Sequence, residues 1–329
     1  MTDEKLIETI CSICGLGQLI NTPEPLTGGY MHKMYSALTS SGKYAVKLLD
    51  PFIMQREDAA ENFRTADMLE AMLEKQSLPI LPALTFGGKK MQCINGRYFY
   101  VFDYFEGVSL KDSEITVGHC KKIGSTLARI HSTDHRDNGF EPDVPDIDWD
   151  GYIKRMQCVN DELYRLLSDN RELLYISMEN GAAALKMLQK VSAVCHNDMD
   201  SKNVLWQGDD LRIIDLECLG YSSPVMEAYE LALCWSGYES CALDTAKFEA
   251  FLTAYKNAGG KLTNDPETLY HSSCGRLEWL GFNVRKSLGE ECEEADIPAA
   301  QAQVKETLAH IRYYESARDT IISALERIG

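Results

Sequence analysis

The chain has 329 residues, of which 45% are hydrophobic and 25% charged, and its formal net charge is −17 at pH 7. This length and composition are typical of a globular protein with a sizeable core, and no stretch approaches the roughly 18 uninterrupted apolar residues of a membrane span. The strong negative charge disfavours nucleic acid and anionic membranes as partners. The same acidity chiefly confers solubility and is only a weak indication of a cationic substrate.

The N-terminus predicts an amphipathic helix that continues through Ile13. Its first residues are polar and acidic, unlike a secretory signal, so the eleven cysteines indicate reduced thiols in a cytoplasmic protein. Cys11 and Cys14 form a Cys-x-x-Cys pair, but no second pair or histidine cluster lies nearby in the sequence. This favours two incidental thiols on a helix over a zinc or redox site.

Two strands joined by a tight turn are predicted between residues 34 and 49, with Gly28 and Gly29 at their entrance. Adjacent glycines let backbone N–H groups approach phosphates, although many β-turns contain them as well. Alternation along the second strand puts Ala45 and Lys47 on one face and Val46 on the other. Lys47 is therefore either a snorkelling side chain on an edge strand or a phosphate ligand, with a small alanine beside it to admit an adenine ring.

A buried lysine needs a carboxylate partner, because its charge is otherwise costly. Residues 55–75 have the apolar spacing of a helix and supply four candidate partners for Lys47: Glu57, Glu61, Asp67 and Glu70. We favour Glu61 or Asp67. Residues 97–107 then predict a core strand rich in aromatic side chains that ends in glycine. Its end marks where the chain leaves a small sheet and enters a helical region.

The most informative segment is His196-x-Asp198-x4-Asn203, followed twelve residues after its asparagine by Asp215. Apolar runs on either side of a turn near Asp209 predict a hairpin. We expect this hairpin to pair Asn203 opposite Asp215, close enough to share one cation, with Asp198 overlooking it. Such short patterns also precede ordinary hairpins by chance. A carboxylate that accepts a proton and an Asn/Asp pair that binds Mg²⁺ are nonetheless what phosphoryl transfer requires.

Together these motifs resemble the aminoglycoside phosphotransferase and choline kinase superfamily over residues 26–235. The likeness rests on Gly28-Gly29, Ala45-Val46-Lys47, the aromatic run ending at Gly107, His196-x-Asp198-x4-Asn203 and Ile214-Asp215-x-Glu217, in that order. The resemblance implies an α+β, two-lobed protein-kinase-like fold. A small antiparallel β-sheet lobe that binds the nucleotide would occupy residues 1–103, and a mostly helical catalytic and acceptor-binding lobe would occupy residues 104–329.

The resemblance also implies a role for each matched residue. Asp198 resembles the catalytic base, and Asn203 and Asp215 resemble the ligands of Mg²⁺. Lys47 resembles the lysine that contacts the α- and β-phosphates of ATP, with GTP as the alternative nucleotide. Further nucleotide contacts are implied for Gly28, Gly29, Ala45, the Asp103 carbonyl and the Phe105 amide.

Several departures favour small-molecule kinases over protein kinases. Glu217 stands where protein kinases have the glycine of Asp-Phe-Gly, Asp200 stands where they have a lysine, and no Ala-Pro-Glu follows. His131, at the end of a helical run, resembles a recurring family histidine. We interpret it as a structural residue that caps a helix or hydrogen-bonds in the core.

The predicted reaction moves the γ-phosphoryl group of ATP to a hydroxyl of a small, amine-bearing acceptor. Two acidic runs, 141–150 and 290–296, belong to the helical lobe, and most of their carboxylates are expected on solvated loops and helix ends. Better candidates for the acceptor pocket follow the metal site: Glu217, Glu227, Glu230 and Glu239. One alternative is a choline-, ethanolamine- or sugar-type kinase. Another is a nucleotide-binding module without catalysis. The presence of all four expected site residues disfavours it: Lys47, Asp198, Asn203 and Asp215.

Overall fold

The computed structural model describes residues 2–26, 32–137, 144–263, 265–290 and 292–329. The chain forms two compact units, each made of two segments. Unit 1 comprises Met1–Glu114 and Val194–Gly220, and unit 2 comprises Ile115–Ala193 and Tyr221–Gly329. The predicted division at residue 103 into a nucleotide lobe and an acceptor lobe stays a prediction, because compactness does not test function.

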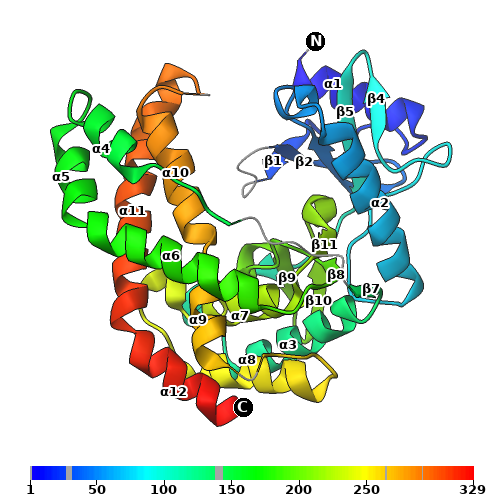
Figure 1. The fold of residues 1–329 in the computed structure, drawn as a ribbon. Coiled ribbons are helices and arrows are strands. Elements are labelled where there is room, and N and C mark those ends of the chain that lie inside the picture. Colours follow the sequence, from blue (N-terminus) through cyan, green and yellow to red (C-terminus); the bar gives the residue numbers. More distant parts are fainter. Residues whose placement is uncertain (1, 27–31, 138–143, 264, 291) are drawn as a thin grey trace. The chain divides into compact units, whose positions relative to one another are not determined.

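Unit 1 contains a five-stranded antiparallel sheet in the order β1-β2-β3-β5-β4 (Figure 1). Its strands are β1 (Glu24–Leu26), β2 (Lys33–Thr39), β3 (Gly42–Leu48), β4 (Gln92–Ile94) and β5 (Arg97–Asp103). The helical elements that precede β4 in the chain are α1 (Asp3–Ile13), η1 (Ile53–Gln55) and α2 (Ala59–Lys75). The predicted first helix, strand pair, second helix and aromatic strand are all confirmed.

The two faces of this sheet pack against different parts of the chain. Val46 and Leu48 of β3 belong to a core cluster with apolar residues of α1. Phe63 of α2 belongs to another cluster, which includes Tyr100 of β5. Lys47 lies opposite Tyr100 in the β3–β5 register, so alternation directs it to the α2 side, as predicted.

A second sheet of unit 1 contains the hairpin that follows the Asp198 loop, in the order β10-β9-β6. These strands are β6 (Val108–Ser109), β9 (Val204–Gln207) and β10 (Asp210–Ile213), and the 3-10 turns η3 (Ser201–Asn203) and η4 (Leu216–Cys218) flank the hairpin. The predicted hairpin is confirmed.

The predicted register of this hairpin is wrong by one residue. Gln207 pairs with Asp210, which leaves a two-residue turn containing Gly208 at φ +61°. Asn203 therefore lies opposite Ile214, whose amide donates to the Asn203 carbonyl (2.9 Å), and not opposite Asp215. The prediction closed the hairpin near Asp209, whereas the observed turn is centred between Gly208 and Asp209, and this difference shifts every pair by one residue.

Unit 2 is mostly helical. Its helices are α3 (Val117–His131), α4 (Trp149–Met156), α5 (Asp161–Asp169), α6 (Arg171–Met187), α7 (Pro224–Cys234), α8 (Thr245–Asn257), α9 (Pro266–Ser272), α10 (Gly275–Ser287), α11 (Ile297–Ser316) and α12 (Arg318–Ile328). The remaining short elements of the chain are η2 (Asp112–Glu114), β7 (His135–Asp137), β8 (Val191–Cys195), β11 (Gly220–Ser222), η5 (Tyr238–Ser240) and η6 (Glu294–Asp296). Trp149, Leu163 and Leu308 lie in a core shared by α4, α5, α6, α10 and α11.

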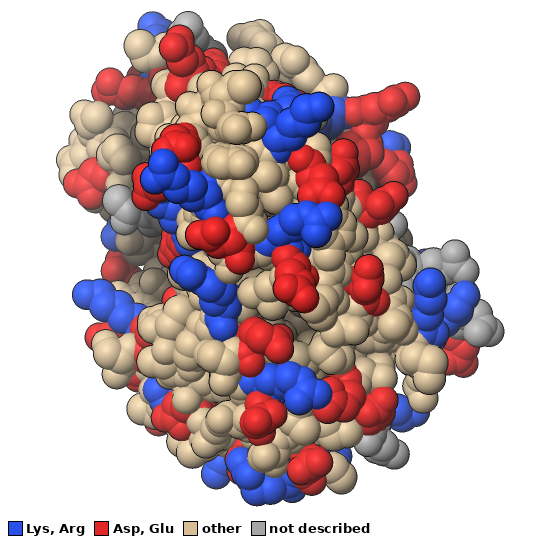
Figure 2. Space-filling model, turned by 60° about the vertical axis from the view of Figure 1, so that its left-hand side comes forward, with Lys and Arg blue, Asp and Glu red and all other residues tan. Residues whose placement is uncertain are grey.

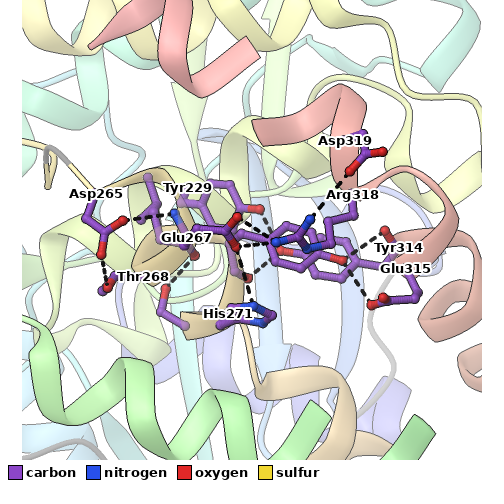
Figure 3. Close-up of polar contacts among 12 residues, drawn as sticks. Tyr229, Asp265, Glu267, Thr268, His271, Tyr314, Glu315, Arg318 and Asp319 are labelled. Carbon is purple, nitrogen blue, oxygen red and sulfur yellow. Dashed lines mark hydrogen bonds and ion pairs between the residues drawn. The ribbon is translucent and has the colours of Figure 1, made fainter. Parts of the chain in front are cut away.

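Polar contacts connect the ends of the later helices in unit 2 (Figure 3). Arg318, the first residue of α12, donates through Nη2 to both carboxylate oxygens of Glu267 on α9 (2.5 and 2.6 Å). Asp265 caps α9 and accepts from the Thr268 hydroxyl (2.6 Å). Both contacts come from one guanidinium nitrogen, so this is a single charge-assisted contact that connects the start of α12 to α9.

The net negative charge is not gathered on one patch of the face drawn in Figure 2, where acidic and basic side chains alternate. Within the described residues, no helix is both long and apolar enough to cross a bilayer.

Candidate active site

The loop between β8 and β9 carries the predicted base, and its asparagine holds that base directly. Asn203 donates through Nδ2 to the backbone carbonyl of Asp198 (2.7 Å) and to its Oδ2 (2.8 Å). The Lys202 ammonium lies 3.4 Å from Asp198 Oδ1 and 2.8 Å from Asp200 Oδ2. The two residues predicted from the His-x-Asp-x4-Asn spacing are therefore in contact.

His196 connects this loop to the end of β10. The Asp198 amide donates to Nδ1 of His196 (3.2 Å), so the ring proton lies on Nε2, which is 3.1 Å from the Ile214 carbonyl and donates to it. The histidine is fully buried. Because Ile214 directly precedes Asp215, His196 couples the position of the base to that of the predicted metal ligand.

Two non-glycine residues of the site have left-handed backbone conformations. Asn197 has φ +63° and Asp215 has φ +61°. Asn and Asp tolerate this region better than other non-glycine residues. The Asn197 side chain also donates to the Cys218 carbonyl (2.8 Å), so the loop before Asp198 is hydrogen-bonded to the loop after Asp215.

The environment of Asp198 suits a proton acceptor. Burial raises the pKa of its carboxyl, and the Lys202 ammonium opposes that rise. The side chain is still 37% exposed. A carboxylate that is partly desolvated and accessible can accept a proton from an incoming hydroxyl group.

The predicted partner of Lys47 on α2 is wrong. The Lys47 ammonium contacts Asp215 Oδ1 (2.5 Å) and, at a shorter distance, Glu217 Oε2. The favoured helix carboxylates have other partners, since Asp67 accepts from the Tyr100 hydroxyl (3.1 Å) and Glu61 pairs with Arg64 (2.6 Å). The helix lies on the correct side of the sheet, but its carboxylates are engaged elsewhere.

Glu217 is thus a site residue whose role the sequence analysis missed. In the sequence, Glu217 stands out because it replaces the glycine of Asp-Phe-Gly. From the sequence alone, this residue is interpreted as a candidate for the acceptor pocket and not as the partner of Lys47. Burial opposes its charge, yet the hydrogen bond from His32 and the charge of Lys47 lower the pKa of its carboxyl. Burial likewise opposes the charge of Lys47, but Glu217 and Asp215 outweigh it and raise the pKa of the ammonium.

The donor atoms near Asp215 fit a hard divalent cation. Asn203 uses its Nδ2 on Asp198, so its Oδ1 is the atom left to act as a ligand. Asp215 supplies a carboxylate that is 32% exposed and now contacts Lys47. Carboxylate and amide oxygens are the ligands that Mg²⁺ accepts in proteins, usually together with water and substrate phosphates.

The end of β5 carries the predicted adenine contacts. The Tyr104 amide donates to the Lys43 carbonyl (3.2 Å), so the next pair in the ladder, Tyr44 with Asp103, is a non-hydrogen-bonded one. The Asp103 carbonyl therefore points away from β3.

The other predicted nucleotide contacts are only partly described. Ala45 lies on the same face of β3 as Lys47 and is 8% exposed. The carbonyl of Phe105 accepts from the Gly107 amide (2.9 Å), which makes a tight turn after the strand. Gly28 and Gly29 lie outside the described residues.

The three other carboxylates predicted for an acceptor pocket have separate environments in unit 2. Glu227 lies 2.7 Å from Nε2 of His131, whose Nδ1 meets the Tyr255 hydroxyl (2.8 Å), which confirms His131 as a hydrogen-bonded core residue. Glu230 accepts from the Ser273 hydroxyl (3.1 Å), and burial raises the pKa of its carboxyl. Glu239 lines a cavity of about 260 Å³, together with Tyr238, Gly275, Arg276, Trp279, Gln303, Glu306, Thr307 and His310.

Three carboxylates of the two acidic runs serve a helix end or surface ion pairs, as expected for most residues of these runs. Asp148 caps α4, and Asp150 pairs with Arg171 (2.5 Å). Glu290 pairs with Arg155. Cys11 and Cys14 are free thiols on α1 and at its C-cap, with no disulfide between them.

Known structures share this architecture at low sequence identity. A spectinomycin phosphotransferase in complex with ADP and spectinomycin is 14% identical, covers 95% of this chain and 99% of its own, and has a TM-score of 0.68. A choline/ethanolamine kinase family protein from Mesorhizobium loti is 16% identical, with 99% and 100% coverage and a TM-score of 0.63. An amicoumacin kinase in complex with AMP-PNP, Ca²⁺ and its antibiotic is 12% identical, with 97% and 94% coverage and a TM-score of 0.63.

At the level of sequence, no curated protein matches the chain. A family model does match, and it describes the phosphotransferase enzyme family over residues 22–269. That range includes the base loop, the hairpin and β3 with Lys47. The chain therefore belongs to the phosphotransferase enzyme family and has the protein-kinase-like fold of aminoglycoside phosphotransferases and choline/ethanolamine kinases.

Proposed function

We propose that this protein transfers the γ-phosphoryl group of ATP to a hydroxyl of a small, amine-bearing acceptor. The observation that carries the proposal is the hydrogen-bonded set in unit 1, where Asn203 contacts Asp198 and Lys47 contacts Asp215. Phosphoryl transfer needs positioning and charge stabilisation more than covalent chemistry. This set supplies a base, a lysine and two metal-binding oxygens, and the backbone of Ile214 connects its two pairs through hydrogen bonds with Asn203 and His196.

Each residue has a distinct task in this proposal. Asp198 orients the acceptor hydroxyl and takes its proton, and Lys202 keeps the carboxylate charged until it does so. Lys47 holds the α- and β-phosphates, and the end of β5 offers the Asp103 carbonyl to the adenine. Mg²⁺, held by Asn203 and Asp215, would neutralise the charge that develops on the phosphates.

The amine-bearing acceptor rests on the net charge of −17 and on the number of carboxylates in unit 2 that follow the metal ligand in sequence. A partly buried carboxylate binds an ammonium through charge-assisted hydrogen bonds, which are roughly twice as strong as neutral ones. The related folds support a small acceptor, since one of those proteins was captured with ADP and spectinomycin.

A thermal-shift grid tests the donor and the acceptor together. Mg²⁺ with ATP or GTP is crossed with aminoglycosides, choline, amino alcohols and neutral sugars. A ligand at 100 times its Kd stabilises the protein by about 2.7 kcal/mol, which a melting curve resolves. We expect a shift with Mg-ATP that is lost in Asp215→Ala, and a further shift with an amine-bearing alcohol. No shift with any nucleotide would contradict the proposed function.

Catalytic efficiency at two salt concentrations then tests the nature of the acceptor. Exposed charges are screened beyond about 8 Å at physiological ionic strength, so turnover of an amine-bearing alcohol should fall at higher salt and turnover of a neutral sugar should not. A preference for neutral sugars without salt dependence would exclude a cationic acceptor and leave the phosphotransferase assignment intact.

A further inference from the structure

The carboxylate of Glu217 is held from both sides by side chains of the first 50 residues. Its Oε1 lies 3.2 Å from Nε2 of His32, and its Oε2 contacts the Lys47 ammonium. Both partners are buried, with His32 8% and Lys47 7% exposed. No function considered so far uses His32.

The tautomer of His32 follows from its other contact. The Asp50 amide donates to Nδ1 of His32 (2.9 Å), so Nδ1 must keep its lone pair. The ring proton of the neutral histidine is therefore on Nε2, the nitrogen that faces Glu217. His32 is thus a fixed donor whose orientation is set by the backbone at the end of β3.

Helix α2 contributes packing to this arrangement and no carboxylate. The ring of Phe63 on α2 lies 6.4 Å from that of His32. Glu70, the most buried acid of the helix, accepts from Lys90 (2.5 Å) and from the Ala83 amide (2.7 Å). Among the described residues, the ion pairs of Lys47 are with Asp215 and Glu217.

We propose that His32 is a positioning residue that acts through Glu217. Glu217 would hold the Lys47 ammonium in place for the phosphates when Asp215 binds a metal. The inference rests on the proposed function. Lys47 now contacts both carboxylates, and Oδ1 of Asp215 becomes available to a metal only when the ammonium moves off that oxygen. Glu217 then remains as the carboxylate partner, and the hydrogen bond from His32 keeps its other oxygen from turning away.

Two amide substitutions separate the two contacts of His32. An asparagine amide reaches about as far as Nδ1 of a histidine, so His32→Asn keeps an acceptor for Asp50 and loses the donor to Glu217. A glutamine amide reaches about as far as Nε2, so His32→Gln keeps the donor. Their polarity is nearly the same, which makes each the matched control of the other.

The measurement is the Kd of the protein for Mg-AMP-PNP, determined by calorimetry. This nucleotide is not turned over, so the readout does not depend on activity. We expect His32→Asn to weaken binding about tenfold, or about 1.4 kcal/mol, as is found for residues that orient a site residue. His32→Gln should bind within about threefold of the unmodified protein. Equal affinity in His32→Asn and the unmodified protein would overturn the inference.

A double-mutant cycle excludes a merely structural effect. Glu217→Gln should also weaken binding about tenfold, and the double variant with His32→Asn should show about the same tenfold loss, because both changes break one pathway. Independent effects would multiply to about a hundredfold and would overturn the inference. Glu217→Gln keeps the experiment decisive if His32→Asn does not fold, since wild-type affinity in that variant overturns it equally.

The proposed function fails by a different result. If the unmodified protein does not bind Mg-AMP-PNP at all, the phosphotransferase assignment and the role of His32 are lost together. If the unmodified protein binds Mg-AMP-PNP and the Asp215→Ala variant does not, the proposed function stands. The His32 variants alone then decide whether His32 is a positioning residue.

Discussion

The ammonium of Lys47 and the carboxylate of Glu217 form an ion pair between residues 170 positions apart in the chain. The same ammonium lies 2.5 Å from Asp215, two residues before Glu217. In this arrangement the loop after the proposed metal ligand, and not helix α2, orients the lysine. Lys47 and the proposed metal ligand Asp215 are therefore parts of one hydrogen-bonded cluster.

Asp198→Asn is expected to lower turnover about 10²- to 10⁴-fold, which is the usual contribution of a general base. The affinity for Mg-nucleotide should stay nearly the same, because Asp198 contacts the acceptor in the proposed reaction. Steady-state kinetics on the acceptor found by the thermal-shift grid, together with calorimetry, checks both parts. Near-wild-type turnover would remove Asp198 from the role of base.

Asp215→Ala and Asn203→Ala are each expected to weaken Mg-dependent nucleotide binding, and Asp215→Ala more strongly because it removes a charged ligand. Calorimetric titration with Mg-ATP measures the loss, and titration without Mg²⁺ should show little difference between the variants. Asp210→Ala, at an exposed position in the same hairpin, is the control and should bind normally. Unchanged affinity in both site variants would refute the proposed metal ligands.

Glu70→Gln is expected to lower the free energy of unfolding by about 2 kcal/mol, because the change removes a charged partner from the buried Lys90. Lys90 keeps its contact with Glu74 (2.9 Å), which limits the loss. The affinity for Mg-nucleotide should not change, since Glu70 does not contact Lys47. A weakened affinity with unchanged stability would show that α2 serves the lysine after all.

Asp3→Asn tests the attachment of α1 to the sheet as a function of pH. Asp3 lies 2.9 Å from the Lys33 ammonium, 3.0 Å from the Tyr35 hydroxyl and 3.4 Å from Arg97. The hydrogen bond from Lys33 is the main cause of its lowered pKa, with burial acting against it. A lowered folded-state pKa stabilises the protein above the ordinary aspartate value of about 3.9, and this contribution is lost as the pH falls through the folded value.

The expected loss in Asp3→Asn is therefore about 1 kcal/mol at pH 7, a modest value because the Lys33 ammonium is mostly exposed and screened. The difference between variant and parent should shrink as the pH is lowered below about 3.9. Urea unfolding at a series of pH values measures it. A difference that stays constant down to the lowest pH would contradict the ionic origin.

Gly124→Ala is expected to destabilise unit 2 by about 1–3 kcal/mol, the usual cost of overpacking. A Cβ on Gly124 of α3 would lie 2.3 Å from the Phe251 carbonyl oxygen on α8, and backbone cannot move aside easily. Gly118→Ala on the same helix is the matched control, because the nearest atom to its Cβ would be the Thr116 hydroxyl oxygen at 3.5 Å. Thermal unfolding should separate the two variants, and equal melting temperatures would refute the clash.

Much of unit 1 follows from patterns that act over a few residues. Period-two alternation predicts the face on which Lys47 lies, because successive side chains of a strand point to opposite sides. Apolar spacing predicts α1 and α2, and the spacing of His196, Asp198 and Asn203 predicts that all three belong to the loop before the hairpin, where the structure has Asn203 in contact with Asp198. Local geometry is enough for these features because the residues involved are close in sequence.

Only the tertiary structure decided how the hairpin pairs and which carboxylate meets Lys47. The turn at Gly208 has two residues, and a one-residue difference in a turn is invisible to hydrophobic pattern but moves Asp215 past Asn203. Lys47 had four plausible partners in or just before α2, and its actual partners, Asp215 and Glu217, lie 168 and 170 residues away. The partner of a buried charge depends on distances and on competing contacts in the folded chain. Closeness in the sequence gives no information about either of these.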